Sequence, residues 1–139
     1  MKREATVADY MTKTPHTIGA DQTVARAHAV MRSHGIRHLP VLQAGELVGI
    51  LTERDLAWIE ASDEAARDKT LVDDAMTPFP YVARESALLR EVAGAMAEGK
   101  YGATLVVDAT GGLVGVFTTV DAMRALEDAL RARSPRRAA

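Results

Sequence analysis

The chain has 139 residues, of which 47% are hydrophobic and 26% charged, a balance typical of a folded domain rather than a disordered chain. The net charge of −2 gives no overall positive field toward nucleic acid or an anionic membrane, and the absence of cysteine excludes disulfides and thiolate zinc sites. No apolar run is long enough to span a bilayer and the first residues lack the apolar core of a signal peptide, so we expect a cytoplasmic protein.

The first predicted elements are a short stretch over residues 7–11 and an extended segment over 16–18. Asp21 is placed to cap the helix that follows, as Ser86 is in the second half of the chain. The helix carries one apolar stripe, formed by Val24, Ala27 and Met31.

Gly35 is expected to end this helix, because glycine breaks a helical run. Residues 36–42 and 47–51 have the pattern of two strands joined by a turn, which predicts a hairpin. Thr52 then begins a last helix, over about residues 53–60.

The second half of the chain repeats the first. At an offset of 65 residues, one set of matches pairs Val7, Met11, Thr12 and Pro15 with Val72, Met76, Thr77 and Pro80. With one more residue in the later turn, a second set pairs Leu47, Val48, Gly49, Thr52 and Asp55 with Leu113, Val114, Gly115, Thr118 and Asp121. The repeat predicts strands over 101–107 and 113–117 and a helix through about residue 130.

The repeat divides the chain into residues 1–61, a charged linker over 62–70, residues 71–130, and a basic flexible tail over 131–139. A unit of about 60 residues is only marginally stable alone. We therefore expect an α/β (α+β) fold in which two β-α-β-β-α repeats pack through their sheets with pseudo-twofold symmetry.

Three phrases of the first copy stand out: Val7-x-x-x-Met11-Thr12-x-x-Pro15, Gly35-Ile36-Arg37-His38-Leu39-Pro40-Val41 and Leu47-Val48-Gly49-Ile50-Leu51-Thr52-Glu53-Arg54-Asp55. They resemble the CBS domain (the cystathionine β-synthase repeat), and the resemblance covers about residues 5–130. The second copy departs from it at Gly102-Ala103-Thr104-Leu105. The resemblance implies a Bateman module, a pair of repeats that binds adenosyl compounds in clefts between them, regulates a partner, and often forms a disc-like homodimer.

The Thr-x-x-Asp motif, present as Thr52 with Asp55 and as Thr118 with Asp121, has two interpretations. It has the spacing of a capping box, which recurs in unrelated helices. The resemblance instead assigns the aspartate to a ribose, whose two hydroxyls a carboxylate can accept. Both interpretations can hold together.

The resemblance also implies a phosphate contact from the basic residues Arg37, His38 and Arg54. On a strand, neighbouring side chains face opposite sides, so at most one of Arg37 and His38 faces a cleft, and an exposed charged edge is the alternative. Gly102 and Ala103 replace them in the second copy, so we expect two unequal sites. Candidates for the adenine pocket are Thr17, Ile18, Ile36, Pro40, Ile50, Val82, Ala83 and Val116. Taken alone, the isoleucines and valines among them fit a core better than the wall of a ligand site.

Other chemistry has little support in the sequence. His34 and His38 are four residues apart, but Gly35 lies between them, and no third metal ligand is in view. The histidines form no catalytic triad, so we expect neither an enzyme nor a metal site. The arginines of the tail could touch nucleic acid, but a solvated tail explains them as well: Arg131, Arg133, Arg136 and Arg137.

The resemblance, taken with these residues, implies a regulatory module that binds AMP, ADP or ATP, ahead of NAD or S-adenosylmethionine, with no obligatory cofactor. It would form a homodimer and act in trans on an unknown protein effector, without a membrane. The alternatives are an interaction or dimerisation module with no ligand or only one functional cleft, and, more weakly, a nucleic-acid-associated protein.

Overall fold

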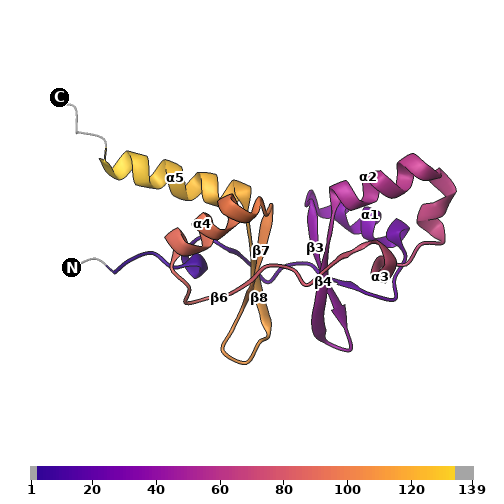
Figure 1. The fold of residues 1–139 in the computed structure, drawn as a ribbon, viewed down its shortest axis with the longest axis horizontal. Helices are drawn as coiled ribbons and strands as arrows, with labels where there is room; N and C mark the ends of the chain where they lie inside the picture. The colour runs from indigo at the N-terminus through magenta and orange to yellow at the C-terminus, as the bar shows by residue number, and fades with distance from the viewer. Residues whose placement is uncertain (1–2, 134–139) are drawn as a thin grey trace. The chain divides into compact units, whose positions relative to one another are not determined.

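The structure is a computed structural model that describes residues 3–133, apart from the side chain of Glu64. The chain forms two compact units. One, here the central unit, is Thr14–Tyr81, and the other, here the split unit, combines Met1–Lys13 with Val82–Ala139. The split unit is thus built from both ends of the chain (Figure 1).

The central unit is a four-stranded sheet in the order β2-β3-β4-β5, with β2 parallel to β3 and the other neighbours antiparallel. Its strands are β2 (Ile18–Gly19), β3 (His38–Gln43), β4 (Glu46–Thr52) and β5 (Thr77–Pro78). Its helical segments are α1 (Val24–His34), α2 (Glu53–Ser62), the 3-10 turn η2 (Glu64–Asp68) and α3 (Val72–Ala75). Both α1 and α2 lie on the same side of the β3–β4 hairpin (Figure 1).

Helix α1 shows how local sequence sets these boundaries. The side chain of Thr23 accepts a hydrogen bond of 3.1 Å from the backbone N–H of Arg26, so Thr23 is the N-cap. Asp21, the cap expected from the sequence, lies two residues too early, and at the start of the matching helix of the split unit the N-cap is Leu88 rather than Ser86. Gly35 ends α1 as predicted, with φ of 62°.

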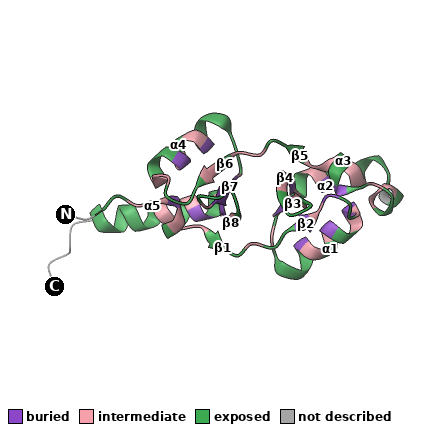
Figure 2. Cartoon of the chain, turned by 90° about the horizontal axis from the view of Figure 1, so that it is seen from below, coloured by how far each residue is buried: buried purple, intermediate pink, exposed green. Residues whose placement is uncertain are grey.

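The core of the central unit lies between the sheet and its helices. The predicted apolar stripe of α1 is buried there with side chains from the sheet, and Figure 2 colours the buried positions of α1 purple. The cluster consists of Ile18, Ala20, Val24, Ala27, Met31, Leu39, Val41, Leu51, Leu56 and Val72. Burying such side chains contributes roughly 1.5–3 kcal/mol each, which makes this cluster the main support of the unit.

The split unit repeats this architecture, with the sheet order β1-β8-β7-β6. Its strands are β1 (Thr12–Lys13), β6 (Val82–Arg84), β7 (Ala103–Val107) and β8 (Leu113–Thr118). Its helical segments are the 3-10 turn η1 (Val7–Asp9), α4 (Leu89–Gly99) and α5 (Thr119–Arg133). Most of α5 is exposed (Figure 2), in contrast to α4, which buries Val92 and Met96.

The two sequence repeats exchange their edge strands. Strand β1 comes from the first repeat but pairs with β8 of the second, and β5 comes from the second repeat but pairs with β4 of the first. A Cβ atom on Gly49 would lie 2.9 Å from the carbonyl oxygen of Thr77, and one on Gly115 would lie 3.0 Å from that of Thr12. Glycine at these positions therefore lets the edge strand approach closely.

The mixed α+β fold and both hairpins confirm the sequence-based expectation. The linker differs from it, because α2 continues to Ser62 and η2 occupies much of the segment expected to be featureless. Of the expected tail, residues 131–133 belong to α5, whereas 134–139, with Arg136 and Arg137, lie outside the described residues. Packing of the two sheets against each other stays a prediction. Within residues 3–133, no helix has the length and apolarity to cross a membrane.

The ends of α1 and α4 provide a matched test of backbone strain. Lys100 ends α4 with φ of 56°, at the position where Gly35 ends α1. In this left-handed region, a residue with a Cβ is destabilised by about 1–2 kcal/mol. Glycine avoids this strain but loses more chain entropy on folding, which offsets part of the gain. We expect Lys100→Gly to raise the free energy of unfolding by about 1 kcal/mol in urea denaturation followed by circular dichroism.

Gly35→Ala is the matched control and is expected to lower the free energy of unfolding by a similar amount. No atom lies within 4 Å of the Cβ it would add, so the cost would come from the backbone alone. An unchanged or lower stability of Lys100→Gly would show that the left-handed end of α4 is not strained.

Candidate functional site

The junction of β4 and α2, here the central corner, holds the first Thr-x-x-Asp motif. The backbone N–H of Thr52 donates to Oδ2 of Asp55 at 2.9 Å, and the backbone N–H of Asp55 donates to Oγ1 of Thr52 at 3.2 Å. This reciprocal pair is a capping box, so the structural interpretation of the motif holds here. It uses only one carboxylate oxygen, and in the described part of the chain Oδ1 of Asp55 accepts no hydrogen bond.

The start of β3 completes the central corner. His38 lies directly opposite Thr52 in the hairpin, so the two side chains share one face of the sheet. The backbone N–H of Glu53 donates to the carbonyl oxygen of Arg37 at 2.9 Å, which fixes the first turn of α2 to the bend that leads into β3. The register of the β3–β4 hairpin thus places the residues predicted to bind a phosphate beside those predicted to bind a ribose.

The guanidinium of Arg37 is mostly exposed. Its Nε lies 3.5 Å from Oε2 of Glu53, whose side chain is also exposed. Such a surface ion pair contributes only about 0.2–1 kcal/mol, so a ligand anion could take the place of Glu53 at low cost. Arg54, in the first turn of α2, is exposed and has no ion pair among residues 3–133.

His38 has an unusual electrostatic position in the central corner. Partial burial and, secondarily, the charge of Arg37 lower the pKa of its imidazole, while Asp55 and Glu53 act in the opposite direction. Neither ring nitrogen makes a hydrogen bond to any residue that the structure describes. The ring is therefore available to a ligand.

The junction of β8 and α5, here the split corner, has the second motif with different surroundings. The backbone N–H of Thr118 donates to Oδ2 of Asp121 at 2.9 Å, and its hydroxyl donates to the same oxygen at 3.3 Å. Oδ1 of Asp121 lies 3.9 Å from Nη1 of Arg124, and the residue is only 4% exposed. Ala103 stands opposite Thr118, where the central corner has His38.

The two corners therefore have the same backbone hydrogen bonding but different side chains. The backbone N–H of Thr119 donates to the carbonyl oxygen of Gly102 at 3.2 Å, just as Glu53 donates to Arg37. The split corner has no imidazole or guanidinium on its strand, and its aspartate already faces a cation. The central corner alone combines an unoccupied carboxylate oxygen with basic groups beside it.

The apolar residues predicted around an adenine fall into separate places. In the central unit, Pro40 and Ile50 are paired across the hairpin, are both buried, and share the sheet face of His38 and Thr52. Ile18 belongs to the core cluster between sheet and helices, and Ile36 packs against that cluster, so neither lies with the Pro40–Ile50 pair.

The remaining candidates lie elsewhere. Thr17 is exposed and, with Ile18, lines a hollow of ≈ 590 Å³ near the β3–β4 turn. In the split unit, Val82 and Val116 flank Leu105 in one row across the sheet, on the face of Thr118. Ala83 pairs with Val106, one residue along, and so faces the other side.

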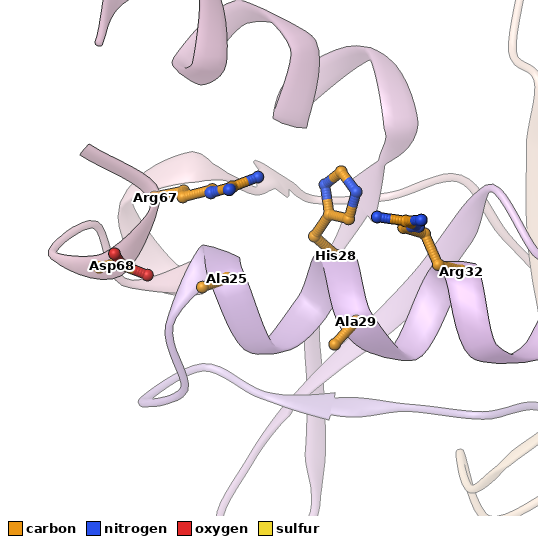
Figure 3. Close-up of a pocket in the computed structure, with 6 residues that line it drawn as sticks. All are labelled: Ala25, His28, Ala29, Arg32, Arg67 and Asp68. Atoms are coloured by element: carbon orange, nitrogen blue, oxygen red, sulfur yellow. The ribbon is translucent and has the colours of Figure 1, made fainter. Parts of the chain in front are cut away.

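A hollow of ≈ 420 Å³ between α1 and η2 was not foreseen from the sequence. Figure 3 shows Arg32 and Arg67 extending toward His28 from either side. Oε1 of Glu60 lies 2.8 Å from Nδ1 of His28 and 3.5 Å from Nη1 of Arg67, although the His28–Glu60 pair lacks the alignment of a hydrogen bond. The charges largely compensate one another, which indicates a tie between α1, α2 and η2.

The histidines do not assemble a metal centre. Across residues 3–133, no group of three or more His, Cys, Asp or Glu side chains could hold a metal ion. His34 instead stacks on His16, with ring centroids 3.6 Å apart, and His38 lies apart from them at the central corner. This stacking could not be predicted from the sequence, because it depends on how the segment before β2 runs past the end of α1.

Known proteins are similar to this chain in both sequence and fold. Inosine-5′-monophosphate dehydrogenase of Korarchaeum cryptofilum is 34% identical over 76% of this chain, which spans only 21% of that relative. The crystal structure of CBSX2, a protein of Arabidopsis thaliana, in complex with AMP is 30% identical, with a TM-score of 0.77 over 88% of this chain and 96% of that one.

The CBS domain pair of protein MJ0100, in complex with 5′-methylthioadenosine and S-adenosyl-L-methionine, is 28% identical, with a TM-score of 0.79 over 91% of this chain and 98% of that one. The model of the CBS domain matches residues 7–60 and again 72–128. These two matches cover most of the chain and coincide with the two sequence repeats. The chain belongs to the CBS domain family, with two copies of the domain.

Proposed function

We propose that the chain is a regulatory module that binds a phosphorylated adenosyl ligand at the central corner and whose ligand state is read by another protein. The proposal rests on the different surroundings of the two carboxylate oxygens of Asp55. One carboxylate oxygen completes the capping box, while the other faces no donor among the described residues. Support comes from CBSX2, whose structure holds AMP, and from the MJ0100 pair, whose structure holds two adenosyl compounds.

The chemistry of the corner fits a ribose joined to a phosphate. A carboxylate oxygen without a donor can accept hydrogen bonds from both hydroxyls of a ribose. The N-terminus of the ten-residue helix α2 favours negative charge beside it. His38 adds a donor at the start of β3, Arg37 adds donors from the bend just before it, and Arg54 adds donors on the first turn of α2. Basic groups of this kind favour AMP, ADP or ATP over S-adenosylmethionine, which carries a cationic sulfonium and no phosphate.

Ligand binding at Asp55 can be tested by thermal shift. We expect millimolar AMP to raise the melting temperature, since a ligand at 100 times its Kd adds about 2.7 kcal/mol, roughly 2–8 °C here. Asp55→Asn is expected to remove most of the rise. Its carboxamide oxygen can still cap Thr52, but the outer oxygen becomes an NH₂ group, which donates instead of accepting.

The matched control is Asp121→Asn, the same change in the split corner, which should leave the AMP shift intact. If no adenosyl compound shifts the melting temperature of the wild type, the sensor proposal is wrong. An equal loss in both aspartate variants would place the ligand elsewhere than the central corner.

A phosphate contact from Arg37 gives a second test. We expect Arg37→Gln to weaken AMP about tenfold or more in isothermal titration calorimetry, since a hydrogen bond to a charged group is worth about 1.5–3 kcal/mol. Adenosine, which lacks the phosphate, should bind within about twofold of the wild type. The control is Arg26→Gln, an exposed arginine at the start of α1. Equal losses for AMP and adenosine would show that Arg37 does not meet the phosphate.

A second candidate function is self-association, and the surface of α5 favours it. Four large apolar side chains of α5 are exposed: Val120, Met123, Leu126 and Leu130. They lie on one face of the helix, within about a third of its circumference. The matching positions of α2 carry Arg54, Ala57 and Glu60, so the stripe belongs to one repeat alone. We propose that two copies associate as a homodimer through this face of α5.

The oligomeric state tests this candidate. If the stripe holds a dimer, the double substitution of Met123 and Leu130 by lysine should convert it to monomer in size-exclusion chromatography with light scattering. Two charges buried in the interface would lack partners there. Ala132→Lys, on the opposite side of α5, is the control and should stay dimeric. A wild-type monomer, or a dimer untouched by the double substitution, would contradict the assignment.

A further inference from the structure

The imidazole of His38 is the titratable group at the centre of the central corner. It shares a sheet face with Thr52, and the charged groups that act on it come from two directions. Arg37 lies in the bend just before β3, and Asp55 and Glu53 come from the first turn of α2. Because both acids already have partners, in the capping box and at Arg37, neither is dedicated to an imidazolium.

This balance favours the neutral form of the ring in the unliganded protein. Burial and the neighbouring guanidinium both disfavour a second positive charge at this place. A phosphate group bound against the same ring would reverse the balance, since an opposite charge at hydrogen-bond distance favours the charged form of a base. The ring has no protein hydrogen bond to break before it meets such a group, as far as the described residues go.

We propose that binding of a phosphorylated ligand at the central corner is coupled to uptake of a proton by His38, so that the corner responds to pH as well as to ligand concentration. The inference rests on the proposed function and adds a regulatory input to it. The ligand class is a phosphate monoester or polyphosphate of adenosine, and adenosine itself would bind without the proton.

The sign of the effect follows from linkage. A group that is neutral in the free protein and protonated in the complex makes binding tighter as pH falls, and each pKa unit that the ligand adds corresponds to roughly a tenfold gain in affinity. The gain ends where the ligand phosphate begins to be protonated, near its own second pKa of about 6. AMP should therefore bind more tightly as the pH falls from neutral toward about 6.

The split corner lacks this device. Ala103 occupies the position of His38, opposite Thr118, and the nearest cation to Asp121 is Arg124, which does not titrate in this range. Any ligand held by the split corner alone would bind without this proton uptake. The coupling is therefore a property of one repeat, although both repeats share the Thr-x-x-Asp motif.

Isothermal titration calorimetry in buffers of different ionisation enthalpy measures the proton directly. At pH 7.2, we expect the wild type to take up more protons on binding AMP than His38→Gln does, with the difference absent for adenosine. The comparison between the two proteins cancels the titration of the ligand phosphate. His34→Gln, which removes an exposed histidine stacked on His16, is the control and should behave as the wild type.

A second measurement covers the case in which His38→Gln no longer binds. The pKa of His38, followed in the wild type by the NMR shift of its ring proton, should rise on saturation with AMP and stay unchanged with adenosine. An unchanged pKa with AMP bound, or equal proton uptake in wild type and His38→Gln, overturns the coupling and leaves the nucleotide site standing. Failure of every adenosyl compound to bind overturns both.

Discussion

The close approach of an edge strand to a glycine is the constraint on which the rest of each unit depends. In the central unit, β5 passes Gly49 so closely that any side chain there would collide with the backbone of Thr77. The same contact recurs in the split unit between Gly115 and β1. In the central unit, this contact adds β5 to the sheet beside the β3–β4 hairpin, and the register of that hairpin places His38 opposite Thr52. The candidate site is thus a consequence of sheet geometry before any ligand is considered.

The two corners show how one backbone can carry different chemistry. Each has a threonine that ends a strand and an aspartate that accepts from the backbone N–H of that threonine. In each, a backbone N–H of the first helical turn bonds to the residue just before the facing strand. Only the central corner adds an imidazole beside the aspartate. In the split corner, an alanine fills that position and Arg124 approaches the aspartate from its own helix. A capping box and a ligand contact are compatible because a carboxylate has two oxygens.

The sequence pattern predicted those features of the fold that depend on neighbouring residues alone. Glycine at the end of α1, the two hairpins and the helix beginning after Thr52 follow from turn chemistry and spacing. The N-cap of α1 was misplaced, because Asp21 and Thr23 are both capping residue types and only the path of the chain decides between them. The side on which Ile18 and Ile36 lie, and the exchange of edge strands, depend on contacts between distant segments. Sequence spacing cannot express such contacts.

The exchange of edge strands has a consequence for how such a chain can arise and be divided. If the sequence were cut between its repeats, the hairpin of each half would lose the edge strand that pairs with it, because the other half supplies that strand. Each half would also keep one short strand without a partner. An open sheet edge is a template for any complementary strand. Two identical halves could therefore satisfy each other by reciprocal swapping. In that view the present chain is such a swapped pair made permanent by a covalent link, and its smallest self-sufficient folding unit is the duplicated whole.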